Sequence, residues 1–504
     1  MMTFSINTLG CKVNQYESQQ VRELLERLGL HKFQPSEQPD LVVVNTCCVT
    51  HNASSKSRQQ IRKARKLYPN AIIVVCGCLP AALEAARTSR LKPAVQIGES
   101  TLSTQNIHFV KKRGDLAVIL SQIVKIPHVF LSRDGNRGAL DSPDYLQEPG
   151  PNNTIKSKVH SKIKHKKELC HIQKLTSLNS FDGQTRAFLK VQDGCDGYCT
   201  YCIVPQTRPF VRSQPAEQVL REAQALVNAG HREIVITGIF LGAYGQKSVR
   251  RKNWPPLLSS GRKTWGQNSK LADLLDKIAQ IPNLARVRLS SLEPADVTSQ
   301  LLDVFCKNDN IMPHLHLSLQ SGSDAVLKKM CRQYNIDQFR EKVELIKSRL
   351  DRPAITTDII AGFPGETNAD FEQTVNLAQD ICFAKMHVFR FSPRKGTAAA
   401  KMPDPVDIAV IKRRSEILRE LDIELGRKFR QQFIGESVNV LIESQNGKPS
   451  GRSERYFMVD IACPERSRRD QNDISNSKFQ IKNNDIVKVR LVKNNKTSMT
   501  GRPF

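Results

Sequence analysis

Cysteines gather near the middle of the chain, in the stretch "QDGCDGYCTYCIVP" at positions 192–205. Cys195, Cys199 and Cys202 have the spacing C-x3-C-x2-C, with Tyr201 just before the last thiol, and are called the loop triad below. Zinc sites usually take a second pair of ligands from the same module, and no suitable pair follows Cys202 nearby. An iron–sulfur cube bound by three thiolates would leave one iron open to a small chelating molecule. The spacing therefore favours an iron–sulfur cluster with an open position.

Further cysteines follow the strand-like runs "TFSINTLG", "DLVVVNT" and "AIIVVCG". These are Cys11, Cys47 and Cys78, called the strand-end triad below. Near-continuous apolar runs between amphipathic helical stretches are typical of parallel strands buried on both faces. The carboxyl ends of such strands share one edge, so we expect the three thiols to converge there. Cys48 should point to the opposite face from Cys47, and Cys76 lies inside its strand, so both are predicted to be core residues.

Strand–helix units repeat from 187 to 392, and their order predicts where catalytic groups lie. The strands are expected at "AFLKVQ", "EIVITGIF", "ARVRLSSL", "HLHLSL", "AITTDIIAGF" and "KMHVFRFS". Six successive units of this kind predict a partial parallel (β/α)6 barrel. The loop triad follows the first strand, in the class of loop where barrel enzymes place their catalytic groups.

Composition indicates where the protein works and what it binds. The chain has 504 residues with 76 Lys and Arg against 49 Asp and Glu, a formal net charge of +27. Such an excess favours a polyanionic partner, nucleic acid first, over a merely solvated surface. No apolar run is long enough for a membrane span, and the start lacks the pattern of a secretion signal. Thirteen scattered cysteines favour metal ligation in a reducing cytoplasm over a disulfide framework.

Several stretches together resemble the radical S-adenosylmethionine methylthiotransferase family, and within it the MtaB-type tRNA enzymes. They are "TLGCKVNQYES", "VVNTC", "CGC", "CDGYCTYCIVP", "RLSSLEP", "LHLSLQSGSD", "TDIIAGFPGET" and "FSPRKGTAAA". The resemblance implies two [4Fe–4S] clusters and S-adenosylmethionine. The loop triad would hold the cluster whose open iron takes the methionyl group and whose electron generates a 5′-deoxyadenosyl radical. The strand-end triad would hold a second cluster, which carries the sulfur.

The strand–helix pattern and the resemblance together predict an α/β fold class and a domain order. An N-terminal parallel α/β domain is expected at 1–110, a basic insertion or linker at 111–183 and the radical barrel at 184–434. The short strands of 435–504 resemble the TRAM domain, a small β-barrel that binds RNA. Further insertions relative to the family are expected at 248–270 and 464–483.

The reaction implied by the resemblance is replacement of an aromatic C–H by C–S–CH3. An adenine C2–H is too weakly acidic for an acid–base route, whereas a carbon radical can attack that position. "TLGCKVNQYES" and "TGIFLGAYG" resemble the threonylcarbamoyl branch, so the expected substrate is N6-threonylcarbamoyladenosine at position 37 of tRNA. The alternatives are isopentenyladenosine tRNA, a ribosomal protein, and a non-catalytic iron–sulfur protein that binds RNA or transfers electrons. The expected partners are the tRNA anticodon loop and an electron donor such as flavodoxin or ferredoxin, with the enzyme a monomer.

Candidate contacts to cofactor and substrate lie near the expected strand ends. Tyr201 adjoins the loop triad, and Thr237 and Gly238 end the second strand, where glycine lets the backbone approach a ligand closely. Candidates at the next three strands are Ser291, Gln320 and Asp358. Each of these could instead be an N-cap or a satisfied strand-end residue.

Basic residues are the candidates for binding anionic groups of the substrate. Candidates for the threonylcarbamoyl carboxylate are Arg288, Arg390 and Arg394, which could instead pair with Glu293 or other acids. Candidates for phosphate contacts are Lys488, Arg490 and Lys493, unless they are simply solvated. Pro209 and Gln214 stand where the family usually has glycine and arginine, so no role is carried over to Arg208 and Arg212.

Overall fold

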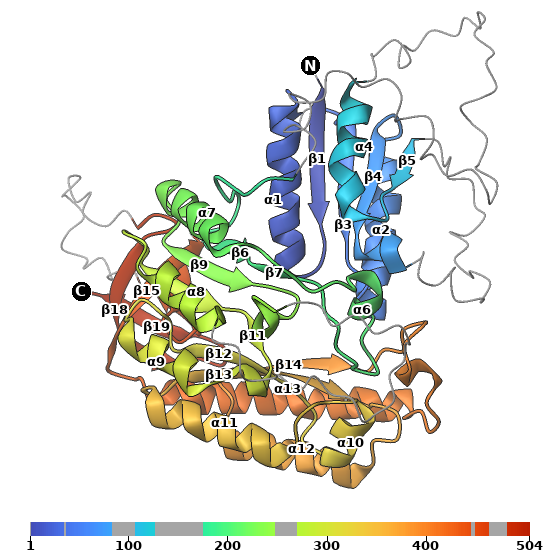
Figure 1. The fold of residues 1–504 in the computed structure, drawn as a ribbon. Coiled ribbons are helices and arrows are strands. Elements are labelled where there is room, and N and C mark those ends of the chain that lie inside the picture. The colour runs from blue at the N-terminus through green and yellow to red at the C-terminus, as the bar shows by residue number, and fades with distance from the viewer. Residues whose placement is uncertain are drawn as a thin grey trace, which may run out of the picture.

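The computed structural model describes residues 2–34, 37–82, 106–125, 175–246, 270–444, 449–462 and 481–504. Three units follow one another along the chain: an N-terminal sheet flanked by helices, a partial barrel, and a small closed barrel (Figure 1). Most of the expected insertions at 111–183, 248–270 and 464–483 lie outside the described residues. None of the described helices has the length and apolar character that crossing a membrane requires.

The N-terminal unit is a parallel sheet with the strand order β2-β1-β3-β4-β5. Its strands are β1 (Thr3–Thr8), β2 (His31–Lys32), β3 (Leu41–Thr46), β4 (Ile72–Gly77) and β5 (Ile107–Phe109), and its helices are α1 (Lys12–Arg27), α2 (His51–Leu67) and α4 (Arg113–Lys125). Apolar side chains of α1 and α4 pack on one face of the sheet and those of α2 on the other. Because both faces are covered, the central strands β3 and β4 are buried and mostly apolar, as the sequence predicted.

The N-terminal unit extends further along the chain than the predicted boundary at 110. Helix α4 buries Leu116, Leu120 and Ile123 in the same cluster as α1, so 113–125 is part of this unit and not of an insertion. The sequence of α4 contains none of the motifs that resemble the family, so the predicted N-terminal domain ended before this helix.

The partial barrel consists of two parallel sheets placed side by side. One has the order β10-β9-β6 and the other β11-β12-β13-β14, and a parallel bridge from Val287 to Ile311 extends the first toward the second. The strands are β6 (Ala187–Lys190), β9 (Glu233–Thr237), β10 (Arg286–Leu289), β11 (Ser291–Leu292), β12 (His314–Gln320), β13 (Ala354–Ala361) and β14 (Lys385–Arg390). The short strands β7 (Gln192–Asp193) and β8 (Arg212–Ser213) pair in antiparallel fashion on either side of the loop triad.

Helices cover the outside of the partial barrel (Figure 1). They are α7 (Ala216–Asn228), α8 (Lys270–Ala279), α9 (Ser299–Lys307), α10 (Asp324–Lys329), α11 (Ile336–Arg349), α12 (Asn368–Ile381) and α13 (Ile408–Gln431), with the short α6 (Val204–Thr207) after the loop triad. Short 3-10 turns, η3 (Leu241–Ala243), η4 (Pro294–Asp296) and η5 (Ala399–Lys401), follow strand ends. One large apolar cluster joins these helices to the strands, and it confirms the predicted α/β barrel.

The C-terminal unit is a closed barrel with the order β15-β16-β17-β19-β18. Its strands are β15 (Ser437–Ser444), β16 (Ser450–Ser453), β17 (Met458–Ile461), β18 (Ile486–Asn494) and β19 (Met499–Pro503). Arg286 and Arg288 of β10 donate hydrogen bonds to backbone carbonyls of Arg452, Asn439 and Glu454 in this unit. The closed barrel therefore covers the side of the partial barrel where these arginines lie.

Candidate active site and cluster positions

The loop triad lies between β7 and α6, next to the carboxyl end of β6. Burial, and then the thiols of Cys202 and Cys199, raise the pKa of Cys195 well above its usual range. The three cysteines lie within one tight loop, in which the Cys202 N–H donates to the Cys199 carbonyl at 3.0 Å. The backbone N–H of Gly197 donates to Cys195 Sγ at 3.3 Å, as amides do toward a thiolate. Gly194 has φ +77°, and a Cβ there would lie 1.9 Å from the carbonyl oxygen of Phe210, so this turn requires glycine. The loop thus presents three converging thiols, which is the donor set that a cluster with one open iron needs.

The strand-end triad converges at the edge of the N-terminal sheet. Cys11 is the N-cap residue of α1, while Cys47 and Cys78 follow β3 and β4. Burial first, then the neighbouring thiols of Cys78 and Cys11, raise the pKa of Cys47 to about 11. Gly10 has φ +108°, and a Cβ at this position would lie 2.8 Å from Cys47 Cβ, so the two loops approach closely. The structure therefore brings together the three thiols that the strand-end argument selected.

Cys48 is fully buried in an apolar cluster, as predicted for a core residue, but its thiol also contacts a member of the triad. Its Sγ donates to the Cys78 carbonyl at 3.4 Å, and a hydrogen bond from its thiol is the main cause that lowers the pKa of Cys78 to about 6. The strand β3 already ends at Thr46, so side-chain alternation no longer applies at Cys48. Cys76 is buried in the apolar cluster with α1 and α4, as predicted.

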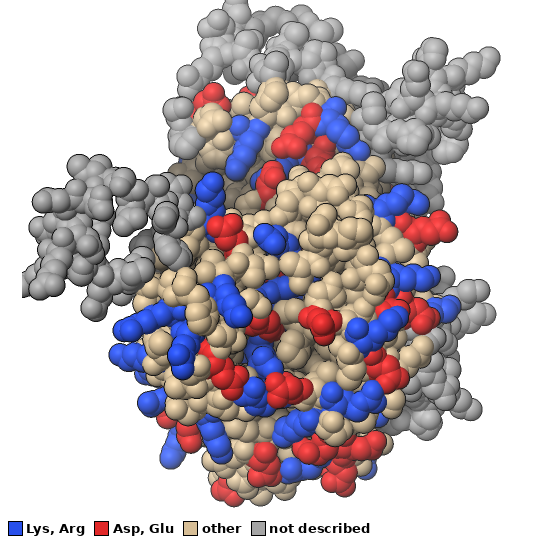
Figure 2. All heavy atoms as spheres, turned by 90° about the vertical axis from the view of Figure 1, so that its left-hand side faces the viewer, with Lys and Arg blue, Asp and Glu red and all other residues tan. Residues whose placement is uncertain are grey.

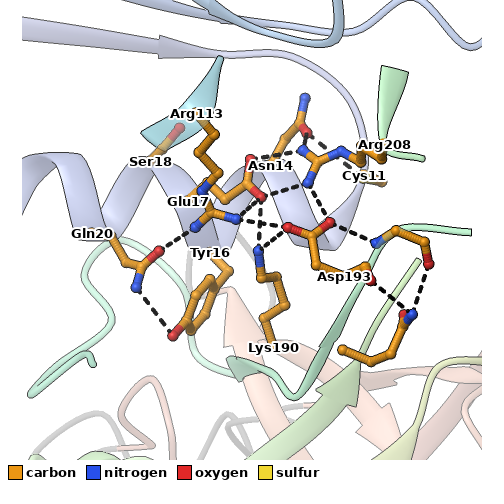
Figure 3. Close-up of polar contacts among 12 residues, drawn as sticks. Cys11, Asn14, Tyr16, Glu17, Ser18, Gln20, Arg113, Lys190, Asp193 and Arg208 are labelled. Atoms are coloured by element: carbon orange, nitrogen blue, oxygen red, sulfur yellow. Dashed lines mark hydrogen bonds and ion pairs between the residues drawn. The ribbon is translucent and has the colours of Figure 1, made fainter. Parts of the chain in front are cut away.

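A buried network of charges links α1, which begins after Cys11, to Asp193 and Arg208, which lie before and after the loop triad in the chain (Figure 3). Arg208, just after α6, forms two hydrogen bonds of 2.8 Å with Glu17 of α1 and one of 2.7 Å with Asp193 of β7. Lys190 Nζ lies 3.0 Å from Glu17 Oε1 and 2.9 Å from Asp193 Oδ2, and Arg113 of α4 contacts the same two carboxylates. The network therefore links α1, α4, β6 and the loop of the first triad.

The network contains three cationic side chains and two carboxylates. Burial raises the pKa of Glu17, but Arg113, Arg208 and Lys190 together hold it well below its usual range. Burial also raises the pKa of Asp193, but the same three cations hold that pKa well below its usual range. Arg208 also acts on Cys78 through a hydrogen bond that lowers the pKa of that thiol. Sequence reasoning assigned no role to these residues, although Glu17 lies in "GCKVNQYES" and Asp193 lies two residues before Cys195.

Arg332 is a second residue that sequence reasoning missed. Its Nη1 donates to Cys199 Sγ at 3.0 Å and lies 3.4 Å from the Tyr201 hydroxyl, and its Nη2 pairs with Glu293. Burial opposes the charge of Arg332, but Glu293 and its other neighbours raise its pKa well above the usual range. The loop triad therefore has a permanent positive charge within hydrogen-bonding distance of one sulfur.

The predicted contact residues lie at different positions along the barrel. Thr237 and Gln320 end β9 and β12, whereas Ser291 begins β11 and Asp358 lies inside β13. Thr237 is buried and its carbonyl accepts from Val191 N–H, whereas a Cβ at Gly238 would lie 2.9 Å from Gln192 Oε1. Gln320 has φ +72° where β12 is irregular, and Ser291 is exposed at the start of β11. Tyr201 packs edge-on against Phe363, at 6.5 Å between ring centroids. Asp358 lies within β13, and its carboxylate is 3.3 Å from His316 Nε2.

Two of the three arginines proposed for the substrate carboxylate are in the wrong place for that role. Arg288 is buried, and its Nε lies 3.0 Å from Glu233 Oε1. This ion pair agrees with the alternative expectation that Arg288 pairs with an acid of the protein. Arg390 donates to Ser415 of α13 on the outer side of the barrel. Arg394 donates to Ser54 of α2 at 2.8 Å and acts on Cys47, so it lies between the two units near the strand-end triad.

Basic residues on the C-terminal barrel are exposed on β18. Arg490 Nε donates to the Gly435 carbonyl, Lys488 lies over the ring of Phe504, and Lys493 is exposed. On the side of the molecule that carries this barrel, Lys and Arg are mixed with Asp and Glu (Figure 2). The positive charge on this side is thus distributed over many separate groups.

Both units that carry a cysteine triad match known families. Residues 3–97 match the family described as Uncharacterized protein family UPF0004, and residues 189–378 match the Radical SAM superfamily. The chain is 35% identical over 459 residues to threonylcarbamoyladenosine tRNA methylthiotransferase MtaB of Thermotoga maritima, which covers 90% of each chain. It is 33% identical over 450 residues to the Bacillus subtilis protein of the same name, covering 88% of this chain and 85% of the relative. It is also 30% identical over 469 residues to tRNA-2-methylthio-N(6)-dimethylallyladenosine synthase of Staphylococcus haemolyticus, covering 92% of this chain and 80% of the relative.

Proposed function

The chain belongs to the radical SAM methylthiotransferase family, in its MtaB-type branch, and from this premise we propose that it converts N6-threonylcarbamoyladenosine at position 37 of tRNA to its 2-methylthio derivative. The single observation that supports this most is the convergence of two cysteine triads from different units, joined by the charge network around Arg208. One reaction needs both a radical source and a sulfur donor near the same carbon atom. Two neighbouring sites, each with three thiols, suit that requirement.

The cofactors are S-adenosylmethionine and an iron–sulfur cluster, which go with the radical SAM superfamily. When bound, they supply the radical that removes hydrogen from an unreactive carbon. In this proposal the loop triad holds that cluster and the strand-end triad holds a second [4Fe–4S] cluster. Arg332 and the Gly197 amide donate to sulfur atoms of the loop triad and offset their negative charge. Beside the strand-end triad, Arg208 donates to Cys78, and the charge of Arg394 acts on Cys47 while its guanidinium donates to Ser54.

The partners in this proposal are a tRNA anticodon loop and a low-potential electron donor of the flavodoxin or ferredoxin type. The net charge of +27 suits a polyanionic substrate. We place the enzyme in the cytoplasm and propose that it acts as a monomer. Tyr201, Thr237, Gly238, Ser291, Gln320 and Asp358 stay the candidates for contacts to the cofactor and the nucleoside.

The proposed substrate has a close alternative, which is the isopentenyl (dimethylallyl) adenosine of tRNA. The MtaB relatives are 33–35% identical to this chain, whereas the dimethylallyladenosine enzyme is 30% identical. The difference favours the threonylcarbamoyl branch. A ribosomal-protein substrate and a non-catalytic iron–sulfur protein are not favoured, because the MtaB relatives are named as tRNA methylthiotransferases.

The experiment offers the anaerobically reconstituted enzyme two tRNAs, one with N6-threonylcarbamoyladenosine and one with N6-isopentenyladenosine. S-adenosylmethionine, sulfide and a reductant are present, and nucleosides are analysed by mass spectrometry. The threonylcarbamoyl substrate should gain a methylthio group. Methylthiolation of the isopentenyl substrate alone would exclude the proposed branch, and methylthiolation of neither would exclude the proposed function.

A further inference from the structure

Two histidines and an aspartate share one face of the neighbouring strands β12, β13 and β14 (Figure 1). His316 pairs in register with Thr356, and Asp358, two residues further along β13, pairs with His387. Because side chains alternate along a strand, these four residues point to the same side of the sheet. Leu315 points to the other side, into the apolar cluster that joins the strands to the helices. The four polar side chains therefore lie on the inner side of the partial barrel.

The spacing of the three potential metal ligands is close to that of a metal site. One ligand atom from each of His316, Asp358 and His387 lies within 4.8 Å of the ligand atoms of the other two. His316 Nε2 is 3.3 Å from Asp358 Oδ2. Ligand atoms bound to a tetrahedral zinc ion lie about 3.3–3.4 Å from one another, because each is about 2.0–2.1 Å from the metal. His316 and Asp358 already have this separation, and the exposed side chain of His387 has room to turn toward them.

His316 has a buried nitrogen that calls for a partner. The residue is 8% exposed, and its Nε2 forms no hydrogen bond with any residue that the structure describes. The contact of 3.3 Å with Asp358 therefore brings the two groups together without a hydrogen bond between them. A buried polar atom that lacks a partner is unfavourable. An ion between this nitrogen and the carboxylate would supply the partner.

The other nitrogen of His316 is held in the way that metal-binding histidines are held. Thr356 Oγ1 lies 3.0 Å from His316 Nδ1 and 3.1 Å from His314 Nε2. Histidines that bind a metal usually donate their second ring N–H to an oxygen atom, which fixes the ring and leaves the first nitrogen free for the metal. The ring of His314 stacks on Tyr456 of the closed barrel, with 4.3 Å between centroids. Thr356 and His314 therefore support the orientation of His316.

A cavity of about 280 Å³ leads to His387 between β14, α13 and the closed barrel. Positively charged side chains also line this cavity, and would repel a cation if they were unpaired. Two of them have acids as partners, since Lys385 pairs with Asp422 and Arg452 Nε lies 3.2 Å from Glu443 Oε1. An ion can thus reach the cluster through a cavity whose charge is partly balanced.

We propose that His316, Asp358 and His387 bind a divalent transition-metal ion of the zinc type. Zinc takes imidazole nitrogen and carboxylate oxygen as ligands, whereas calcium and magnesium prefer sites built from oxygen atoms. Three protein ligands leave at least one position on the ion for water or another ligand. The site contains no cysteine, and it is independent of the proposed function because neither triad takes part in it.

The test counts zinc bound to the anaerobically reconstituted enzyme. The protein is equilibrated with zinc at micromolar free concentration, and the bound metal is measured by mass spectrometry. The wild type should bind about one zinc per chain more than His387→Gln or Asp358→Asn. Thr356→Val should keep the ligands but weaken zinc binding roughly 10- to 100-fold, as loss of a hydrogen bond to a metal-binding histidine does. His31→Gln, at an exposed histidine of β2, is the control and should bind as much zinc as the wild type.

X-ray absorption at the zinc edge identifies the ligands in the wild type, because this edge is far from that of the cluster iron. Nitrogen and oxygen ligands at about 2.0–2.1 Å are expected. A wild type that binds no zinc, or binds it only through sulfur at about 2.3 Å, overturns the proposal without reference to any variant. Equal zinc content in the wild type, His387→Gln and Asp358→Asn also overturns it. Because His387 is exposed, its replacement leaves the core intact, which circular dichroism checks.

Discussion

Arg208 and Glu17 form a bidentate ion pair between the loop of one cysteine triad and the helix that begins at the other. Both contacts, Nη1–Oε1 and Nη2–Oε2, are 2.8 Å long, and both side chains are nearly buried. A fork of this kind fixes orientation as well as distance. The relative position of the two triads therefore depends on this pair and on the charges around it.

Removing Glu17 should destabilise the protein more than removing Arg208. The network has three cations, Arg113, Lys190 and Arg208, and two acids, Glu17 and Asp193. Glu17→Gln leaves three cations facing one acid, which should cost about 3–5 kcal/mol of stability. Arg208→Gln leaves two cations facing two acids and should cost less. Urea unfolding followed by circular dichroism at neutral pH measures both, with the exposed Arg340→Gln as a control that should change stability by at most about 0.5 kcal/mol. An equal or larger loss in Arg208→Gln would contradict this charge balance.

The iron content of cysteine variants should show whether each triad binds its own cluster. Reconstituted wild type should contain about eight irons per chain if each triad holds a cube. Replacing the loop triad with alanines should remove about half of the iron, and Cys306→Ala, at an exposed site on α9, should remove none. The triple variant should also lose cleavage of S-adenosylmethionine. Full iron content in the triple variant would show that the loop triad holds no cluster.

Single changes in the strand-end triad should stop thiolation but not radical formation. Cys11→Ala, Cys47→Ala and Cys78→Ala should lose the second cluster and still release 5′-deoxyadenosine from S-adenosylmethionine. Cys48→Ala and Cys76→Ala should keep both clusters. Cys48→Ala is the more informative of these two variants, because the Cys48 thiol donates to the Cys78 carbonyl although it is fully buried among apolar side chains. Loss of iron in Cys48→Ala, measured beside Cys47→Ala, would mean that Cys48 is the ligand.

Arg332 should set the reduction potential of the loop-triad cluster. A guanidinium 3.0 Å from Cys199 Sγ stabilises the more negative, reduced state of a cluster bound there. Arg332→Gln should therefore lower the potential, on the order of 50 mV, which is close to tenfold for a one-electron couple. A redox titration followed by electron paramagnetic resonance in a Cys47→Ala background isolates this cluster. The exposed Arg340→Gln is the matched control, and an unchanged potential in Arg332→Gln would remove the electrostatic role.

Sequence reasoning succeeded where position along a strand was sufficient. Cys11, Cys47 and Cys78 each follow a parallel strand, and parallel strands end at the same edge, so their convergence needed no tertiary information. The partial barrel was likewise predicted from local patterns, whereas the closed C-terminal barrel was expected from the resemblance of its short strands to the TRAM domain. The same reasoning was wrong for Arg288 and Arg390, because lying near a strand end does not decide which face or end of the barrel a side chain reaches. Arg288 contacts the C-terminal unit, and Arg390 faces α13.

The contacts that joined the units could not be predicted in this way. Glu17, Asp193 and Arg208 come from three segments, and their pairing exists only once α1 has docked on the barrel. Helix α4 was missed for a related reason: its burial depends on α1 and the sheet that it covers.

Binding of tRNA should weaken with salt in a way that identifies phosphate contacts on the C-terminal barrel. Lys488 and Lys493 are exposed on β18, whereas Arg490 is tied to the Gly435 carbonyl. Each lysine that neutralises a phosphate releases condensed counterions, so its removal should reduce the slope of log K against log salt by about 0.7–0.9. Lys488→Ala and Lys493→Ala are compared with Lys347→Ala, which pairs with Glu344 on the outer helix α11. Binding is measured from low to moderate salt by filter retention with full-length tRNA. A slope that is unchanged in both β18 variants would mean that the closed barrel serves to seal the partial barrel and that phosphates bind elsewhere.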